Sequence, residues 1–336
     1  MNRKICLFIT FITLGTTVLA QKQPDVTRNA MESISKEELT KHLTTLASDE
    51  MEGRKTGEIG QKKAAAYLRD FYKKNGIEAF PGTDDYFQKV PSEAMKRMFS
   101  PKLNDSENVI AYIKGTEKPD EYIVISAHYD HVGIANGEIF NGADDNGTGT
   151  SAILEIARVF NEQKKKGNAP KRSVIFLHCT GEEYGLHGSR FFVNSGIVKM
   201  EDIVADLNVD MIGRTDFKYE GTKKDYIYLV GSDKLSMELH ELSESANKQY
   251  TNLLLDYTYN DEKNPEMIYY RSDHYNFAKY GIPVIFYYSG EHADYHKATD
   301  TVEKIDFDKM LKRTRLILVT ALELANKDQR LKLKNS

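Results

Sequence analysis

Beyond about residue 108, short apolar runs alternate along the chain with segments of helical pattern. The runs read NVIAYIKG, EYIVISAH, RSVIFLHCT, GSRFFVNSG, IVADLNVDMIG, YIYLVG and IPVIFYYSG. Helices are predicted at 149–160, near 233–250 and from about Asp306 onward. Continuously apolar strands separated by helices are typical of a largely parallel sheet covered on both faces. The sequence therefore predicts an α/β fold with three layers, αβα, and a mixed, mostly parallel central sheet.

Two further helices are predicted ahead of these runs. Ser35, followed three residues later by Glu38, forms a capping-box pattern before an apolar stretch with helical spacing. The segment GQKKAAAYLRDFYKKNGIE also has helical periodicity, and Gly76 stands where a C-terminal cap is expected.

The first twenty residues, MNRKICLFITFITLGTTVLA, have the composition of a signal peptide. A short basic start at Arg3 and Lys4 precedes an apolar core, and Ala20 is small enough for a cleavage site. A membrane anchor is the rival interpretation, but the apolar stretch is shorter than the roughly 20 residues that a spanning helix needs. We therefore expect cleavage near Ala20 and export to the periplasm or the extracellular medium.

Cleavage would lower the formal net charge from −4 to −6, because it removes Arg3 and Lys4 and no acidic residue. This charge argues against nucleic acid or an anionic membrane as a partner, and no stable membrane insertion is expected. Cys179 would be the one thiol left, which excludes an internal disulfide. No repeat or linker divides the remainder, so we predict a single domain over 21–336, with its oligomeric state left open.

Side chains that can bind metal gather where the predicted strands end. They are His128, Asp130, Asp145, Glu182, Glu183, Asp210 and His296. In α/β sheets ligands bind beyond the carboxyl ends of the strands, and imidazoles mixed with carboxylates suit zinc or a similar divalent ion. A single histidine or acid at such a place is more often structural, but several at one sheet edge favour a metal site.

Six short segments occur in a fixed order: HYDHVG, GADDNGTG, GEEYGLHGS, NVDMIG, RSDHYNF and DYHKATDT. Together they resemble the co-catalytic zinc exopeptidase family, which includes secreted bacterial leucyl aminopeptidases and glutamate carboxypeptidases. The resemblance extends from about Leu39 to the last helix. It implies the zinc exopeptidase type of fold and a zinc metallopeptidase domain over 21–336.

The resemblance also implies two Zn²⁺ ions per chain. His128 and Asp210 correspond to ligands of one zinc, and Glu183 and His296 to ligands of the other. Asp145 corresponds to the carboxylate that bridges both ions.

The adjacent aspartates Asp144 and Asp145 raise a question of charge, because like charges held close make each other harder to ionise. Two bound cations would favour the ionised form of Asp145, and Asp144 would then be a solvated or hydrogen-bonded neighbour. The resemblance further implies that the peptide bond from Asp145 to Asn146 is cis.

Three more positions match functional residues of the family. Asp130 resembles a carboxylate that accepts the second imidazole N–H of His128 and fixes the ring. Glu182 corresponds to the general base, which takes a proton from a metal-bridging water and delivers it to the leaving amine. Tyr295 matches a tyrosine that in some relatives donates to the tetrahedral oxyanion, with packing as the alternative role.

The other histidines are interpreted as structural. They are His42, His131, His178, His187, His240, His274 and His292. His131, His187 and His292 are expected in loops near the site, with no ligand position left to fill. Cys179, inside a strand exit, is expected to act as a small buried hydrophobe.

The leading functional hypothesis is a secreted two-zinc aminopeptidase that releases N-terminal residues from peptides. The alternatives are a glutaminyl cyclase-like acyltransferase, a carboxypeptidase or dipeptidase of the same fold, and a non-catalytic binding ectodomain. DDNGTG and GEEYGLHGS are closer to the peptidases, and the filled ligand positions argue against a binding ectodomain. Carboxypeptidase-type relatives often carry an inserted domain, for which 81–106 is too short. RTDFKYEGTKKD and DYTYNDEKNPEMIYYR are predicted to form the cleft rim.

Overall fold

The computed structural model of the chain describes residues 25–97, 101–223, 225–261 and 263–334. The predicted signal peptide, 1–20, lies outside the described residues. Within the part described, no helix combines the length and the apolar character that crossing a membrane requires.

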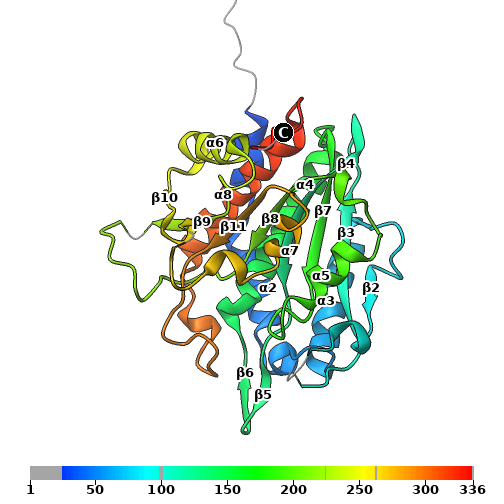
Figure 1. Ribbon diagram of the computed structural model, residues 1–336, viewed down its shortest axis with the longest axis vertical. Helices are drawn as coiled ribbons and strands as arrows, with labels where there is room; N and C mark the ends of the chain where they lie inside the picture. Colours follow the sequence, from blue (N-terminus) through cyan, green and yellow to red (C-terminus); the bar gives the residue numbers. More distant parts are fainter. Residues whose placement is uncertain (1–24, 98–100, 224, 262, 335–336) are drawn as a thin grey trace, which may run out of the picture.

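A mixed nine-stranded sheet runs through the centre of the molecule (Figure 1). Its path is β1-β3-β7-β4-β8-β11-β9-β10, and β2 pairs with β3 outside this path. The strands are β1 (Glu78–Ala79), β2 (Phe87–Val90), β3 (Ser106–Ile113), β4 (Lys118–His128), β7 (Arg172–Cys179), β8 (Ile203–Val209), β9 (Tyr226–Val230), β10 (Leu254–Asp256) and β11 (Val284–Tyr288).

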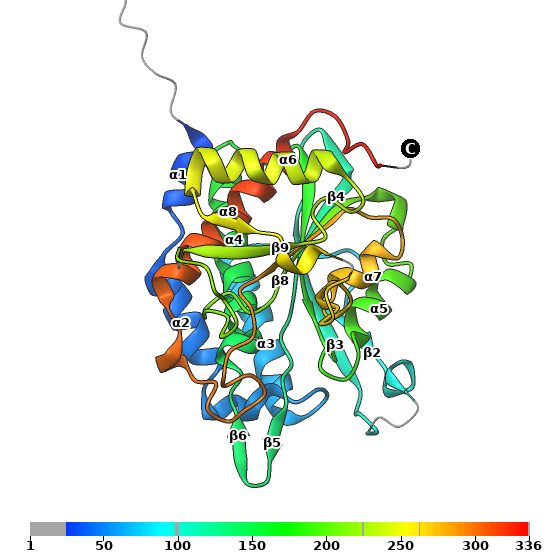
Figure 2. The same cartoon turned by 60° about the vertical axis from the view of Figure 1, so that its left-hand side comes forward.

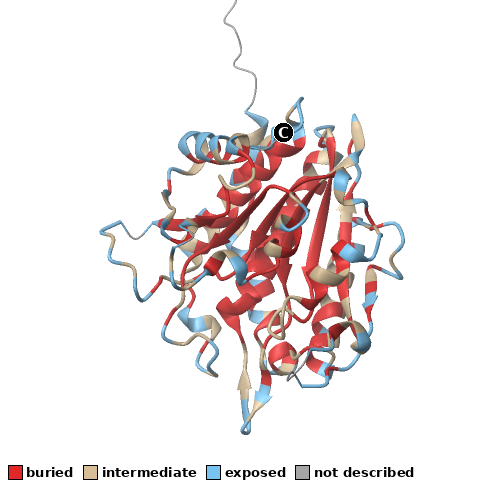
Figure 3. Cartoon of the chain, in the orientation of Figure 1, coloured by how far each residue is buried: buried red, intermediate tan, exposed pale blue. Residues whose placement is uncertain are grey.

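The middle of this sheet is parallel, and an antiparallel pair joins it to the strands on each side. β7, β4, β8 and β11 are parallel neighbours, whereas β3 joins β7 and β9 joins β11 in antiparallel fashion. Every residue of β7, β8 and β11 is buried, which is why these strands read as continuous apolar runs (Figure 3). The predicted mixed sheet is confirmed, with four parallel and four antiparallel strand pairings.

Helices cover both faces of the sheet, as the two views show (Figures 1 and 2). One face carries helices from both ends of the chain, and the other carries two short ones. The first group is α1 (Val26–Glu32), α2 (Lys36–Leu46), α3 (Ile59–Asn75), α4 (Gly149–Lys165), α6 (Met237–Ala246) and α8 (Phe307–Asn326); the second is α5 (His187–Asn194) and α7 (His274–Ala278).

Strand alternation builds a core on each side of the sheet. Along β4, Ile123 and Ile125 belong to the core beneath α2, α4 and α8, whereas Val124 belongs to the core beneath α5 and α7. Both faces of the central strands are therefore dry, and polar groups concentrate at the strand ends.

Local sequence signals explain most helix ends, with one correction. The Ser35 hydroxyl accepts the Glu38 amide at 3.2 Å to begin α2, and Gly76 closes α3 at φ +69°. The run GSRFFVNSG, grouped above with the β-rich runs, instead forms α5. Phe192 and Val193 pack there against the second core, which a short amphipathic helix satisfies as well as a strand.

A separate two-stranded hairpin, β5 (Gly133–Ala135) with β6 (Glu138–Phe140), projects from the sheet edge where β4 ends (Figure 1). It connects the HYDHVG segment to the GADDNGTG segment. Both ends of the hairpin therefore lie at the candidate site.

Candidate metal centre

The parallel strands deliver predicted site residues to one edge of the sheet. β4 ends at His128 itself, β7 is followed by Glu182 and Glu183, and β8 is followed by Asp210. Because these strands are parallel neighbours, their carboxyl ends lie side by side.

The remaining predicted ligands come from loops at the same edge. Asp145 lies in the turn Ala143–Thr148 that leads into α4, and His296 lies in the loop after β11. The Asp145–Asn146 peptide bond is cis, as the resemblance implied. The structure thus brings all five predicted ligands together.

One half of the cluster forms around His128. Its Nε2 atom lies 3.3 Å from Asp145 Oδ1 and 3.4 Å from Asp210 Oδ1. Burial alone lowers the pKa of His128, but the neighbouring carboxylates, Asp210 foremost, raise it well above its usual value.

The other half of the cluster forms around Glu183. His296 Nε2 lies 3.0 Å from both Glu183 Oε2 and Asp145 Oδ2. Asp145 therefore directs one oxygen to each half. Burial raises the pKa of Asp145, yet the surrounding imidazoles, His131 and His128 before His296, hold it well below its ordinary value.

These donors fit a divalent metal. Ligand atoms of His128, Asp145 and Asp210 lie within 4.8 Å of one another. Among the described residues, no group donates a well-formed hydrogen bond to the buried Asp145 Oδ2 and Asp210 Oδ1, although imidazole nitrogens lie 3.0 and 3.4 Å from them. Buried carboxylate oxygens that lack a donor are costly unless a cation compensates them. Imidazole with carboxylates is a donor set that zinc accepts.

His131 is closer to this centre than the sequence suggested. Its Nδ1 atom lies 2.6 Å from Glu183 Oε1 and 3.7 Å from Asp145 Oδ2. Gly142 makes this possible, because a Cβ there would meet the His131 ring at 2.4 Å. The interpretation of His131 as a structural loop residue missed this contact, although its place in HYDH was the available signal.

The predicted contact of Asp130 with His128 needs a correction. The acceptor near His128 Nδ1 is the backbone carbonyl of Asp130, at 3.1 Å, whereas the carboxylate Oδ1 is 3.9 Å away. The Asp130 carboxylate instead accepts the Thr56 hydroxyl at 2.6 Å and the Glu182 amide at 3.2 Å. These two donors turn the carboxylate toward the Glu182 loop. Asp130 therefore holds together the segment that contains Thr56 and the loop that carries Glu182.

A chain of buried hydrogen bonds orients Asp210. Ser272 Oγ donates to Asp210 Oδ2 at 2.8 Å, and Asn208 Nδ2 donates to Ser272 Oγ at 2.8 Å. Ser126 Oγ lies 3.1 Å from the Asn208 side-chain carbonyl and 2.7 Å from Asp206 Oδ1, the shorter of its two contacts. Ligands fixed in this way lose little freedom when a metal binds.

The turn that carries Asp145 is held from behind. Asp300 Oδ2 accepts the amides of Asp144 and Asp145 at 3.0 and 3.1 Å. Asp144 Oδ1 accepts the Thr148 hydroxyl at 3.0 Å and the Gly213 amide at 2.7 Å. Asp144 is thus hydrogen-bonded in the turn and points away from the centre.

Arg54, which the sequence analysis did not single out, fastens the loops around the centre. Its guanidinium is 1% exposed and donates to four backbone carbonyls at 2.6–2.9 Å. Burial lowers its pKa to about 10, so the group stays charged near neutral pH. The four carbonyls belong to Leu46, Tyr129, Asn141 and Gly142.

Several predicted structural residues are buried away from the metal donors. His178 Nε2 lies 2.6 Å from the Tyr72 hydroxyl, and His292 Nε2 lies 3.4 Å from Asp144 Oδ2 behind the turn. Cys179 is a free, buried thiol whose pKa burial raises well above the usual value. This thiol fits the predicted small hydrophobe.

A small hollow opens beside the centre. Ile268 and Arg271, which line it, come from the tyrosine-rich segment predicted as the rim. Arg271 pairs with Glu291 at 2.9 Å. The full lining is His128, Asp145, Glu182, Asp210, Met211, Ile268, Arg271, Phe286, Tyr288 and Tyr295.

Glu182 and Tyr295 line this hollow. They also line a second, outer hollow, whose lining includes Glu183 and His296. Both side chains therefore stand where a bound molecule would cross the centre. Burial, followed by the Asp145 and Glu183 carboxylates, raises the pKa of the Tyr295 hydroxyl, which keeps it a donor at neutral pH.

The family model for peptidase family M28 matches residues 108–321, which include every predicted ligand. The chain belongs to peptidase family M28. The predicted family resemblance and the predicted enzyme class, a metallopeptidase of the zinc exopeptidase type, are confirmed.

Several curated relatives of this M28 member are named as leucine aminopeptidases. A probable leucine aminopeptidase of Arthroderma benhamiae is 31% identical over 275 residues, which cover 79% of this chain and 71% of that protein. Leucine aminopeptidase 1 of Ajellomyces dermatitidis is 29% identical over 303 residues, or 88% of this chain and 72% of that one. The match to the Arthroderma otae protein, 31% identical, spans 62% of this chain and 55% of that relative.

Solved structures share the fold. LapB from Legionella pneumophila aligns with a TM-score of 0.68 at 22% identity, over 89% of this chain and 74% of that one. A zinc aminopeptidase from Bacillus subtilis aligns with a TM-score of 0.65 at 17% identity, over 88% of this chain and 97% of that one. At these identities the comparison shows the fold alone, and it confirms the predicted zinc exopeptidase architecture.

Proposed function

We propose that this M28 member is an exported aminopeptidase that holds two zinc ions and releases N-terminal residues from peptides. The observation that carries the proposal is the placement of Asp145. One of its oxygens faces His128 and the other faces Glu183 with His296. His128 and Asp210 would hold one ion, and Glu183 and His296 the other.

When bound, the zinc ions supply Lewis-acid polarisation of the scissile carbonyl and acidify the attacking water. Glu182 would take the proton of that water and pass it to the leaving amine, because it lines both hollows without being a ligand. Tyr295 would donate a hydrogen bond from its hydroxyl group to the developing oxyanion. His131 would keep Glu183 oriented through its 2.6 Å contact.

The relatives named leucine aminopeptidases suggest that an apolar N-terminal residue is released. Met211, Ile268 and Phe286 contribute apolar surface to the hollow beside the centre, although charged and polar side chains make up most of its lining.

Assays of the purified enzyme with zinc test the activity and its polarity. We expect release of free amino acid from leucyl and methionyl amides and from unblocked peptides. N-acetylation should abolish turnover, because the amino terminus must reach the centre. Release of a C-terminal residue from blocked peptides would indicate a carboxypeptidase, and cyclisation of N-terminal glutamine would indicate an acyltransferase.

Metal removal tests the cofactor. Dialysis against a strong chelator should abolish activity, and added Zn²⁺ should restore it in two steps if both halves of the cluster fill. Asp145→Asn should weaken both ions together, since this carboxylate faces both halves. Loss of a single ion in Asp145→Asn, measured by metal content, would contradict the bridging role.

A further inference from the structure

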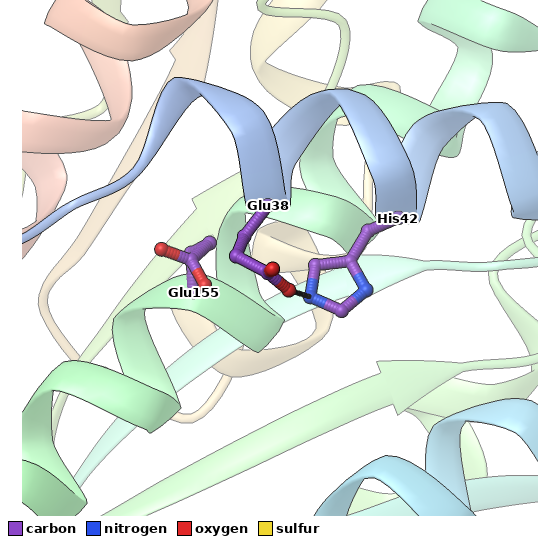
Figure 4. Close-up of side chains that lie close together, drawn as sticks. All are labelled: Glu38, His42 and Glu155. Carbon is purple, nitrogen blue, oxygen red and sulfur yellow. Dashed lines mark ion pairs between the residues drawn. The ribbon is translucent and has the colours of Figure 1, made fainter.

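A second group of potential metal ligands lies between two helices, and it shares no residue with the ligand cluster at the strand ends (Figure 4). Glu38 and His42 stand one turn apart on α2, and Glu155 comes from α4. One ligand atom from each lies within 4.8 Å of the other two. The activity proposed above uses none of these residues.

His42 gives the clearest sign of an absent partner. The residue is 2% exposed, and its Nδ1 lies 2.7 Å from the Tyr67 hydroxyl. Its Nε2 has no hydrogen-bond partner among the described residues and points at Glu38, whose Oε2 is 3.9 Å away. That separation is too long for a hydrogen bond, so a buried ring nitrogen is left without a partner.

The ring of His42 is suited to metal binding. Burial lowers the pKa of His42 to about 4, so the imidazole is neutral near pH 7. When Nδ1 donates its proton to the Tyr67 oxygen, Nε2 presents a lone pair toward the carboxylates. A hydrogen bond that fixes one ring nitrogen while the other binds metal is the usual arrangement for histidine ligands.

The carboxylates are arranged to leave room for a cation. Glu155 is fully buried, and its Oε2 accepts the Ser35 amide at 3.1 Å. In the capping box that the sequence suggested, Glu38 would have taken this amide. Since Glu155 takes it, the Glu38 carboxylate is directed toward His42 instead. Arg158 donates to both oxygens of Glu155 at 2.7 and 2.8 Å, but a carboxylate has about four acceptor positions and keeps one free.

The charged groups around the cluster carry a net negative charge. Glu38, Glu155 and Glu162 face Lys41 and Arg158, so the five groups sum to −1 with His42 neutral. Lys41 contacts Glu38 Oε2 at 3.0 Å, yet its side chain is 59% exposed. A solvated lysine can leave that contact at little cost.

A surface hollow adjoins the cluster. It is lined by Glu38, Lys41, His42, Tyr67 and Arg158 among others. An ion can therefore approach the Glu38 carboxylate from solvent, and local movement of the Glu38 and Lys41 side chains is enough to open the way to His42 Nε2.

We propose that Glu38, His42 and Glu155 bind a third divalent ion, of the zinc class, that joins α2 to α4. One imidazole with two carboxylates matches the ligands zinc takes, with water completing the set. The ion stabilises the fold and takes no part in the reaction. Because α4 follows directly on the turn that carries Asp145, the ion also steadies the base of the active-site turn.

Calorimetric Zn²⁺ titration and metal content of the full-length chain test this site. Wild type should bind one more ion per chain than His42→Gln. Glu38→Gln should bind that ion at least about 10-fold more weakly, since even a residue that only orients a metal ligand contributes this much. Lys41→Gln should bind it roughly 2-fold to 5-fold more tightly, the range expected when an exposed competing ion pair is removed.

Glu37→Gln is the matched control, because Glu37 is exposed on the same turn and outside the cluster. It removes one negative charge and should leave the ion unchanged. The comparison is a difference between variants, so it holds whether the active site takes one ion or two. If His42→Gln does not fold, the surface variants Glu38→Gln and Lys41→Gln decide.

Equal ion counts and affinities in wild type and Glu38→Gln would overturn the site. So would an equal loss in Glu37→Gln, which would indicate a general charge effect. Zinc should also raise the melting temperature of wild type more than that of Glu38→Gln. Identical shifts in melting temperature would mean that the cluster is only a polar contact between the two helices and binds no ion.

Discussion

Glu182→Gln is expected to lower kcat by about 100-fold to 10,000-fold, the usual contribution of a general base. Glutamine nearly matches glutamate in shape but cannot accept the proton of the attacking water. Glu182 lines both hollows and is not in either half of the ligand cluster, so zinc content and substrate binding should be retained. Steady-state kinetics combined with metal content measures both effects.

Glu183→Gln provides the comparison within the same turn. Glu183 contacts His131 and His296 at 2.6 and 3.0 Å, so its loss should release one ion and excess zinc should partly restore activity. Zinc should not rescue Glu182→Gln. If Glu182→Gln loses metal, or turns over its best substrate at nearly the normal rate, the two glutamates have exchanged roles or the base lies elsewhere.

The sequence was sufficient to predict the fold because the central strands are buried on both faces. A strand such as β11, VIFYY, is buried at every position, so its apolar run identifies it directly. The short helix α5 was grouped with the β-rich runs because its apolar pair, Phe192 and Val193, carries no clear period. Segments this short take the conformation that their packing demands.

The ligand positions could be predicted because topology alone collects them. Residues that follow parallel strand ends must lie at one edge, so His128, Glu183 and Asp210 were found together. Arg54 could not be found in this way. Its guanidinium donates to carbonyls as far apart in the sequence as those of Leu46 and Gly142, and no local sequence pattern predicts such contacts.

The atom-level details also depend on tertiary contacts. Asp130 was expected to hold His128 by its carboxylate, but Thr56 and the Glu182 amide occupy that group. Spacing within HYDHVG specifies which residue lies near the imidazole. It does not specify whether the side chain or the backbone carbonyl is the acceptor.

Tyr295→Phe is expected to lower kcat by about 10-fold to 1000-fold, because it removes a donor aimed at charge that develops in the transition state. The Tyr295 ring stacks on His296 with centroids 3.9 Å apart, and phenylalanine preserves that contact. The neighbouring ligand should therefore stay in place, with zinc content unchanged. A group that acts only in the transition state lowers kcat and kcat/KM together and leaves KM nearly constant.

Tyr270→Phe is the matched control for this prediction. Tyr270 is exposed and lines the outer hollow with Tyr295, but unlike Tyr295 it does not line the hollow that contains His128 and Asp210. Removing its hydroxyl should change kcat by less than about 2-fold, since substitutions at exposed positions usually have small effects. An unchanged kcat in Tyr295→Phe would assign this side chain to packing. A raised KM at constant kcat would mean that its hydroxyl binds the substrate equally in the ground state and the transition state. The oxyanion would then need another donor, and Arg271 lines the same hollow.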